Sequence, residues 1–213
     1  MSMRAARASV KIRAFHPYPA HHMEAFLFST GIVALAEMGD KTQLLAFLLA
    51  AKFRRPVPIV LGILVATVAN HALAAAVGAW ISSALGPQAL RWVLGISFLA
   101  MAAWTLVPDK LDEGDAKVGH YGVFLATVVA FFIAEMGDKT QIATVALAAR
   151  FDSVVAVVAG TTLGMMLANV PAVYFGEQIA NKVPLPLVHG IAAVLFALLG
   201  VATLLGAGGR FGI

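Results

Sequence analysis

One heptapeptide occurs twice in this chain, letter for letter, and both copies lie inside long apolar stretches. The sequence Glu-Met-Gly-Asp-Lys-Thr-Gln forms residues 37–43, called motif 1 below, and residues 135–141, called motif 2. An ionisable side chain at the centre of a bilayer costs about 2.5–3.5 kcal/mol on insertion scales, so such residues tend to mark ion or substrate pathways. Two identical charged clusters in apolar surroundings therefore indicate a pathway for a charged substrate.

The composition places the chain among membrane proteins. Of its 213 residues, 61% are hydrophobic and 12% are charged, and the mean hydropathy is +0.88. Soluble domains carry about 45–50% apolar and about 25% charged residues. Here the apolar residues come in blocks of about 20, the length that a helix needs to cross a bilayer. This argues against a soluble all-α enzyme, and the lack of cysteine excludes disulfides and thiolate metal sites.

Six apolar blocks are long enough to span a membrane, and turn residues such as Pro56, Gly86 and Pro184 separate them. We therefore expect an all-α membrane protein with six transmembrane helices. The expected spans are residues 24–51, 58–82, 88–107, 119–149, 153–179 and 187–205.

Charged segments divide the chain further. Residues 1–22 are basic and lack the apolar core of a signal peptide, so we interpret them as a disordered tail or as an extension upstream of a true start at Met23. Residues 108–118 are rich in acids and are expected to form a solvated linker. Residues 23–107 and 119–213 are then two units of three helices each.

The two units are repeats of one another. An offset of 98 residues, from 37 to 135, superimposes the motifs and also aligns residues in the first two helices of each unit. Because three is an odd number of spans, the second unit must enter the membrane from the opposite side, which makes the repeats inverted. Inverted repeats place a substrate site near the bilayer midplane and support alternating access. The aligned pairs include Phe26 with Phe124, Ala36 with Ala134, Gly62 with Gly160 and Gly78 with Gly176.

Each motif places two acids three residues apart, so that Glu37 and Asp40 would share one face of a continuous helix. The apolar flanks on the two sides of motif 1 are each too short to cross a bilayer alone, which takes about 20 residues. The motif therefore belongs in the middle of a span. Its glycine, Gly39 or Gly137, permits a local break of the kind that transporters use to free carbonyl oxygens.

If the motifs converge, they form one site of four carboxylates and two lysines, and −4 with +2 gives a formal charge of −2. A divalent cation would neutralise this charge, and two protons would do so after the cation leaves, because crowded carboxylates hold protons tightly. Carboxylate, hydroxyl and amide oxygens suit Mg²⁺, Ca²⁺ or Mn²⁺. The expected metal ligands are Glu37, Asp40, Glu135 and Asp138. The expected supporting ligands or gates are Lys41, Thr42, Gln43, Lys139, Thr140, Gln141, Asn70 and Asn169.

Other roles are open to these residues. The lysine of each motif could pair with the glutamate four residues before it, and each motif could be a salt-bridge cluster that locks helices together, although its duplication in inverted halves disfavours this. Asn70 and Asn169 could hydrogen-bond between helices instead of binding an ion. We interpret His71 as a polar packing residue without a counterpart in the second half. A channel with a static ring of carboxylates is a further alternative, whereas an intramembrane enzyme leaves the duplicated lysines unexplained.

The twin E-x-G-D-K-T motif in two three-helix halves resembles the Gdt family, also called uncharacterised protein family 0016. This family includes manganese exporters of bacteria and Golgi calcium/manganese exchangers of eukaryotes. The resemblance runs from Met23 to the C-terminus and implies a secondary active transporter, not an enzyme, whose motif acids bind the ion. It implies Mn²⁺ efflux by cation/proton antiport, with Ca²⁺/proton antiport as the alternative. The expected partners are a divalent metal ion and the lipid bilayer, with no cofactor and no nucleic acid, in a multi-pass protein of the bacterial cytoplasmic membrane.

Overall fold

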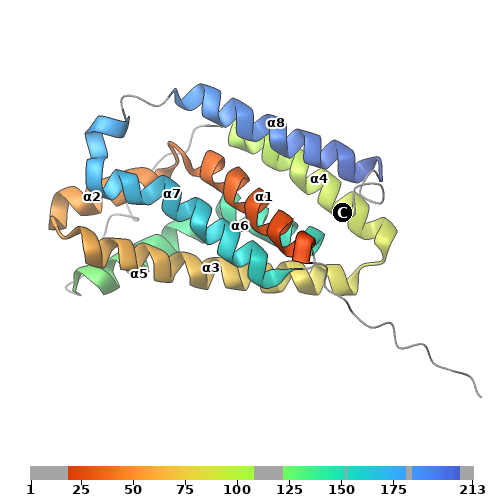
Figure 1. The fold of residues 1–213 in the computed structure, drawn as a ribbon, viewed down its shortest axis with the longest axis horizontal. Helices are drawn as coiled ribbons and strands as arrows, with labels where there is room; N and C mark the ends of the chain where they lie inside the picture. The colour runs from red at the N-terminus through yellow and green to blue at the C-terminus, as the bar shows by residue number, and fades with distance from the viewer. Residues whose placement is uncertain (1–18, 108–121, 152, 181–183, 207–213) are drawn as a thin grey trace, which may run out of the picture.

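The computed structural model describes residues 19–107, 122–151, 153–180 and 184–206. These residues form eight α-helices packed as an elongated bundle (Figure 1). The predicted acidic linker, 108–118, and most of the predicted tail, 1–22, lie outside them, although the first helix already begins at Pro19. The helices are α1 (Pro19–Glu37), α2 (Lys41–Phe53), α3 (Pro56–Ala84), α4 (Pro87–Thr105), α5 (Val123–Glu135), α6 (Lys139–Phe151), α7 (Val154–Ala180) and α8 (Leu185–Leu204).

The first predicted span, 24–51, and the described part of the fourth, 119–149, are each divided into two helices. The breaks fall inside the motifs, between α1 and α2 and between α5 and α6. Gly39 has φ 80° and Gly137 has φ 76°, a left-handed conformation that glycine adopts without a steric penalty. The local break predicted at these two glycines is thus confirmed.

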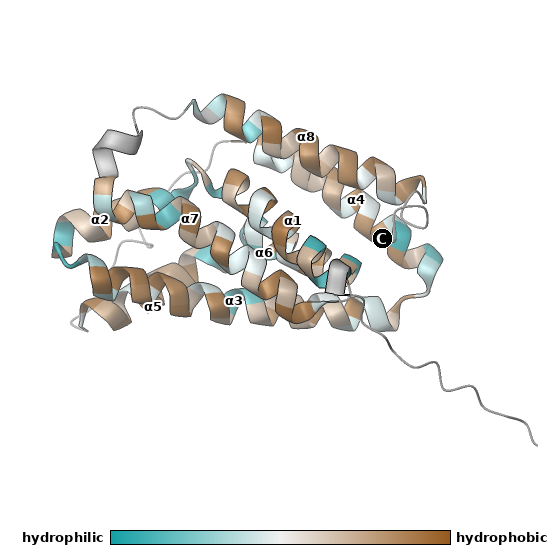
Figure 2. Cartoon of the chain, viewed as in Figure 1, coloured by the Kyte–Doolittle hydropathy of each residue, from teal (hydrophilic) through white to brown (hydrophobic). Residues whose placement is uncertain are grey.

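Among the residues that the structure describes, three helical segments are long and apolar enough to cross a membrane by length and composition: Pro56–Ala84, Val154–Phe175 and Pro186–Leu204. The helices on either side of the motif 2 break, α5 and α6, have 13 residues each and are too short to do so separately. Figure 2 shows apolar residues along most of the bundle, with hydrophilic ones gathered at helix ends and at the breaks.

The two halves of the chain pack against each other through matching contacts. The first helix of each half packs along the long helix that follows the motif of the opposite half: α1 packs on α7, and α5 packs on α3. A Cβ atom added to Gly62 would lie 2.7 Å from Thr127 Cβ, and one added to Gly160 would lie 2.5 Å from the Phe26 carbonyl oxygen. Gly62 and Gly160 are counterparts, which here means residues related by the offset of 98. The halves are therefore related by a pseudo-two-fold axis in these contacts.

The remaining helices, α4 and α8, form an antiparallel pair along one edge of the bundle (Figure 1). They approach closely at Gly95 and Gly200, where an added Cβ would meet the partner helix within 3 Å. Beside this crossing, the rings of Phe98 and Phe196 stack with centroids 6.4 Å apart and planes inclined by 24°. These two buried phenylalanines are also counterparts, so a local two-fold axis of the α4–α8 pair passes between them.

We predict that Gly62→Val and Gly160→Val each destabilise the protein by about 1–3 kcal/mol, the usual cost of overpacking a close contact. The added carbons would collide with backbone and Cβ atoms of the facing helix, which cannot move aside as a flexible side-chain tip can. Thermal unfolding in detergent measures the effect. Gly31→Ala is the matched control, because nothing lies within 4 Å of its added Cβ, and an equal loss in that variant would contradict the packing argument.

Candidate metal-binding site

At each helix break, the glutamine of the same motif accepts a hydrogen bond from the backbone of the glycine. The backbone N–H of Gly39 donates to Gln43 Oε1 at 2.8 Å, and that of Gly137 donates to Gln141 Oε1 at 2.7 Å. The amide nitrogen of each glutamine then donates to the opposite half of the chain, Gln43 to the Ala168 carbonyl at 2.9 Å. The predicted amide ligands therefore shape the break and join the halves.

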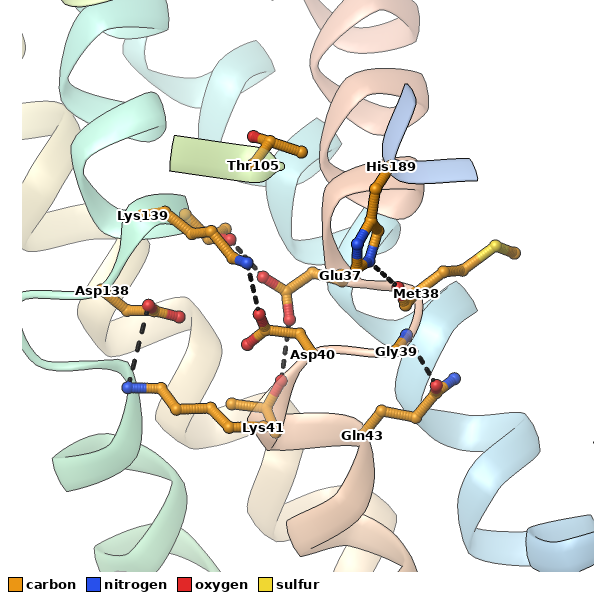
Figure 3. A network of polar contacts seen from close by, with 12 residues as sticks. Glu37, Met38, Gly39, Asp40, Lys41, Gln43, Thr105, Asp138, Lys139 and His189 are labelled. Atoms are coloured by element: carbon orange, nitrogen blue, oxygen red, sulfur yellow. Dashed lines mark hydrogen bonds and ion pairs between the residues drawn. The ribbon is translucent and has the colours of Figure 1, made fainter. Parts of the chain in front are cut away.

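The motifs face each other across the bundle, and their ion pairs cross between them (Figure 3). Lys139 Nζ lies 2.8 Å from Asp40 Oδ1, and Lys41 Nζ lies 3.7 Å from Asp138 Oδ1. The alternative in which each lysine pairs with the glutamate of its own motif is wrong. It assumed i, i+4 geometry, which exists only on a continuous helix, and the break between positions 37 and 41 removes it.

The two glutamates of the motifs have different environments. Glu37 accepts a hydrogen bond from Thr42 Oγ1 at 2.8 Å and another from Thr140 Oγ1. Glu135 is fully buried, and neither of its carboxylate oxygens accepts a hydrogen bond from any residue that the structure describes. Both motif threonines thus donate to Glu37, and the buried carboxylate of Glu135 has no hydroxyl donor among the described residues.

Three of the four predicted ligands come together. One carboxylate oxygen from each of Glu37, Glu135 and Asp138 lies within 4.8 Å of the other two, and all three residues are buried. The fourth, Asp40, is also buried and takes part in the shorter ion pair. The motifs therefore converge, as a shared site requires, while their metal binding and their depth in a membrane stay predictions.

The charges of the cluster do not cancel among themselves. Each aspartate is paired with a lysine, which accounts for two of the four carboxylates. The two glutamates then leave a formal charge of −2 in a buried site. A structural salt-bridge cluster explains the aspartates and lysines, but it gives no role to Glu135, whose oxygens meet no donor among the described residues. The arrangement suits a divalent cation between the glutamates.

The two predicted asparagines have different contacts: Asn70 of α3 bonds to the second half of the chain, and Asn169 of α7 bonds within its own helix. Asn70 donates from Nδ2 to the Phe132 carbonyl at 3.1 Å and accepts from Gln141 Nε2 at 3.3 Å. Asn169 donates to the Met165 carbonyl within its own helix at 3.1 Å. Hydrogen bonding between helices, the second interpretation of these residues, is therefore observed for Asn70, whereas the hydrogen bond of Asn169 lies within α7.

The counterpart of Asn70 by the offset of 98 is Ala168, whose backbone carbonyl takes the place of the asparagine side chain. Asn169 is in turn the counterpart of His71, so the prediction that His71 has none was wrong. Residue type pairs Asn70 with Asn169, whereas the offset of 98 pairs Asn169 with His71. Both His71 and Asn169 are fully buried.

Two residues near the cluster were not identified from the sequence. His189 of α8 donates from Nε2 to the Met38 carbonyl at 2.6 Å, at the break of motif 1. Thr105, at the end of α4, lies near the same cluster (Figure 3) and is fully buried, and its hydroxyl donates to the Met101 carbonyl of its own helix. In the sequence, each of them is a polar residue near the end of an apolar block, and this does not distinguish them from other residues at helix ends.

The chain is similar to known proteins over most of its length. The family model described as "Divalent cation/proton antiporter GDT1" matches residues 25–113 and 123–210. A Vibrio cholerae protein named "Putative manganese exporter" is 52% identical over 190 residues, which cover 88% of this chain and 94% of that protein. A GDT1-like protein of Synechocystis is 29% identical, covering 85% and 97%, and GDT1-like protein 3 of Oryza sativa is 30% identical, covering 81% and 71%. No solved structure gives a significant match.

We predict that Lys139→Gln destabilises the protein more than Lys41→Gln does. The Lys139 side chain is 1% exposed and its ion pair is short, whereas that of Lys41 is 19% exposed and its pair is longer. Breaking a buried pair costs about 3–5 kcal/mol because it leaves an uncompensated buried charge, and the cost falls where solvent reaches one of the partners, as it reaches Lys41. Thermal unfolding in detergent compares the two variants. The double variant Asp40→Asn with Lys139→Gln removes both charges and should recover much of the loss; no recovery would contradict the pairing.

Proposed function

This chain belongs to the GDT1 family of divalent cation/proton antiporters, and we propose that it exports Mn²⁺ in exchange for protons, with Glu37 and Glu135 as the central ligands. The observation that carries the proposal is the pair of buried glutamates left with a charge of −2 beside two Lys–Asp ion pairs. The name of the Vibrio cholerae relative points to manganese as the cation.

The donor set fits an oxygen-seeking cation. Glu37, Glu135 and Asp138 each present a carboxylate oxygen to the same point, and Thr42 and Thr140 add hydroxyl oxygens at its edge. Hard divalent cations take such ligands, and no soft sulfur ligand comes from cysteine, which the chain lacks. Asp138 completes the ligand set in this proposal, while Asp40 holds Lys139 beside the site.

Exchange follows from charge neutrality. Two glutamates this close in a buried site require a compensating positive charge, which either one divalent cation or two protons supply. Protons and metal then compete for the same oxygens, so that release of one accompanies uptake of the other. The two motif threonines supply hydroxyl donors to a glutamate that has lost its metal, as they do to Glu37.

The contacts support six spans arranged as two inverted repeats. Gly160 lies beside Phe26 and Gly164 beside Thr30, so α1 and α7 run in the same direction. If each half crosses the membrane three times, with α2 continuing the span of α1, then α7 is antiparallel to the span that precedes it. The α5–α6 span is therefore antiparallel to the α1–α2 span, which is the inverted relation. In this proposal residues 23–107 and 119–213 are the repeats, the motifs lie near mid-membrane, and the protein resides in a bacterial cell membrane.

Calcium is the alternative substrate, and magnesium ranks below both. Ca²⁺ prefers 6–8 oxygen ligands at about 2.3–2.6 Å, which the motif carboxylates and hydroxyls can approach when several bind in bidentate fashion. Mg²⁺ sheds its water reluctantly and seldom occupies a cage made of protein ligands alone.

The test is transport by the purified protein in proteoliposomes, with Mn²⁺, Ca²⁺ and Mg²⁺ offered in parallel. We predict saturable Mn²⁺ flux that is driven by a pH gradient and falls to the level of empty liposomes in Glu37→Gln and Glu135→Gln. Each change keeps the shape of the side chain but removes one negative charge and one proton-accepting group. Flux that does not saturate and ignores the pH gradient would indicate a channel, and normal flux in both variants would show that the glutamates are structural.

The same proposal makes a cellular prediction. Cells that lack the protein should accumulate manganese and become sensitive to it, and the wild-type gene should restore both properties where a Glu37→Gln copy does not. Growth on graded MnCl₂ and measurement of cell metal content report the outcome. A deletion strain with unchanged manganese content but a calcium defect would make Ca²⁺ the substrate.

A further inference from the structure

The α4–α8 pair sits asymmetrically on a bundle whose other contacts obey the pseudo-two-fold axis. In this pair, α8 packs against α1 and α4 packs against α6. The equivalent contacts of the other half would be α4 with α5 and α8 with α2, and they are not formed to a comparable extent among the described residues. The hydrophobic core shows the same bias. Buried residues of α4 and α8 belong to the cluster that includes α1 and α6, and none joins the cluster formed by α2, α3, α5 and α7.

The helix breaks differ in the same sense. His189, the fifth residue of α8, donates to the carbonyl of Met38 in motif 1. Its counterpart is Arg91, the fifth residue of α4, which lies beside Gly206 at the end of α8 instead of at motif 2. Met136, the counterpart of Met38, is 55% exposed. Within the described ranges, the helix pair therefore covers the break of motif 1 and leaves the break of motif 2 uncovered.

The two ends of the pair show a second unequal contact. Arg150 of α6 donates from Nη1 to Thr203 Oγ1 of α8 at 3.1 Å. The counterparts of these residues are Lys52 of α2 and Thr105 of α4. Lys52 is exposed, and within the described part of the chain its contact is with the ring of Phe53, not with Thr105. The threonines are otherwise equivalent, since each donates to the carbonyl four residues earlier in its own helix.

We propose that the α4–α8 pair is the moving gate of the exchanger and that His189 and Arg91 are its alternating gate residues. In the described state His189 covers motif 1. In the second state each unequal contact is replaced by its counterpart, so that Arg91 covers motif 2, Lys52 meets Thr105, and Thr42 and Thr140 turn from Glu37 to Glu135. This inference rests on the proposed exchange function, because a site between two repeats needs two such states to release its ion on both sides.

The stacked pair Phe98–Phe196 is the pivot of this motion. Both rings are fully buried and lie across the local two-fold axis of the pair, so each can take the place of the other when the pair exchanges its contacts. The close glycine crossing at Gly95 and Gly200 holds α4 and α8 together as one body. The gate therefore tilts without separating its helices, and the ends of the pair exchange their contacts.

The chain has no cysteine, so pairs of introduced thiols report each state directly. The variant Arg150→Cys with Thr203→Cys probes the described state, and Lys52→Cys with Thr105→Cys probes the second. We expect a short bifunctional methanethiosulfonate to cross-link both pairs in liposomes. Each cross-link should reduce Mn²⁺ flux to background, and a reductant should restore it. The matched control, Lys52→Cys with Thr203→Cys, joins positions that meet in neither state and should not react.

The gate residue is tested in the same background. His189→Ala removes the donor that holds the described state and should increase the yield of the 52–105 cross-link. His189→Gln keeps an N–H donor and should leave the yield near that of the parent. A transporting protein whose 52–105 pair never cross-links, or whose flux survives a complete 150–203 cross-link, would overturn the moving gate. Cross-links are read on gels without ion flux, so an absent Mn²⁺ flux in the unmodified protein would count against the proposed function alone.

Discussion

The crossed Lys–Asp pairs are the interaction on which the rest of the structure depends. A buried charge without a partner costs several kcal/mol, so each motif can lie inside the bundle only while the other is in contact with it. This contact requires a break in both helices, because Asp40 and Lys41 start a new helix and so can reach the opposite motif. It also requires the halves to approach closely, which the absence of a side chain at Gly62 and Gly160 permits.

The sequence was sufficient for the parts of the structure that depend on residue type alone. Apolar blocks predicted the helices, the repeated motif predicted a shared site, and glycine predicted the breaks. The ion-pair partners were not predictable, since i, i+4 arithmetic applies only to an unbroken helix. The positions of His189 and Thr105 beside the cluster were not predictable either. They depend on how α4 and α8 pack against the other helices, which no periodicity in the chain encodes.

The two identical motifs make different contacts in the same structure. Glu37 and Glu135 have the same local sequence, yet one holds two hydroxyl donors and the other holds none among the described residues. The difference arises from the helices that pack around them and not from the motifs. Identical motif sequences thus meet different surroundings, and tertiary packing decides which of the two glutamates the threonines contact.

The hydrogen bonds of the two motif glutamines differ in how they can be lost during evolution. Gln43 donates to the backbone carbonyl of Ala168, a group that every amino acid carries, so substitution of that residue does not remove the acceptor. Gln141 donates to the side chain of Asn70, which a single codon change can delete. Motif 1 is therefore anchored by a feature of the polypeptide itself, and motif 2 by one residue that selection must retain. Genetic drift in this protein would loosen the second half of the site before the first.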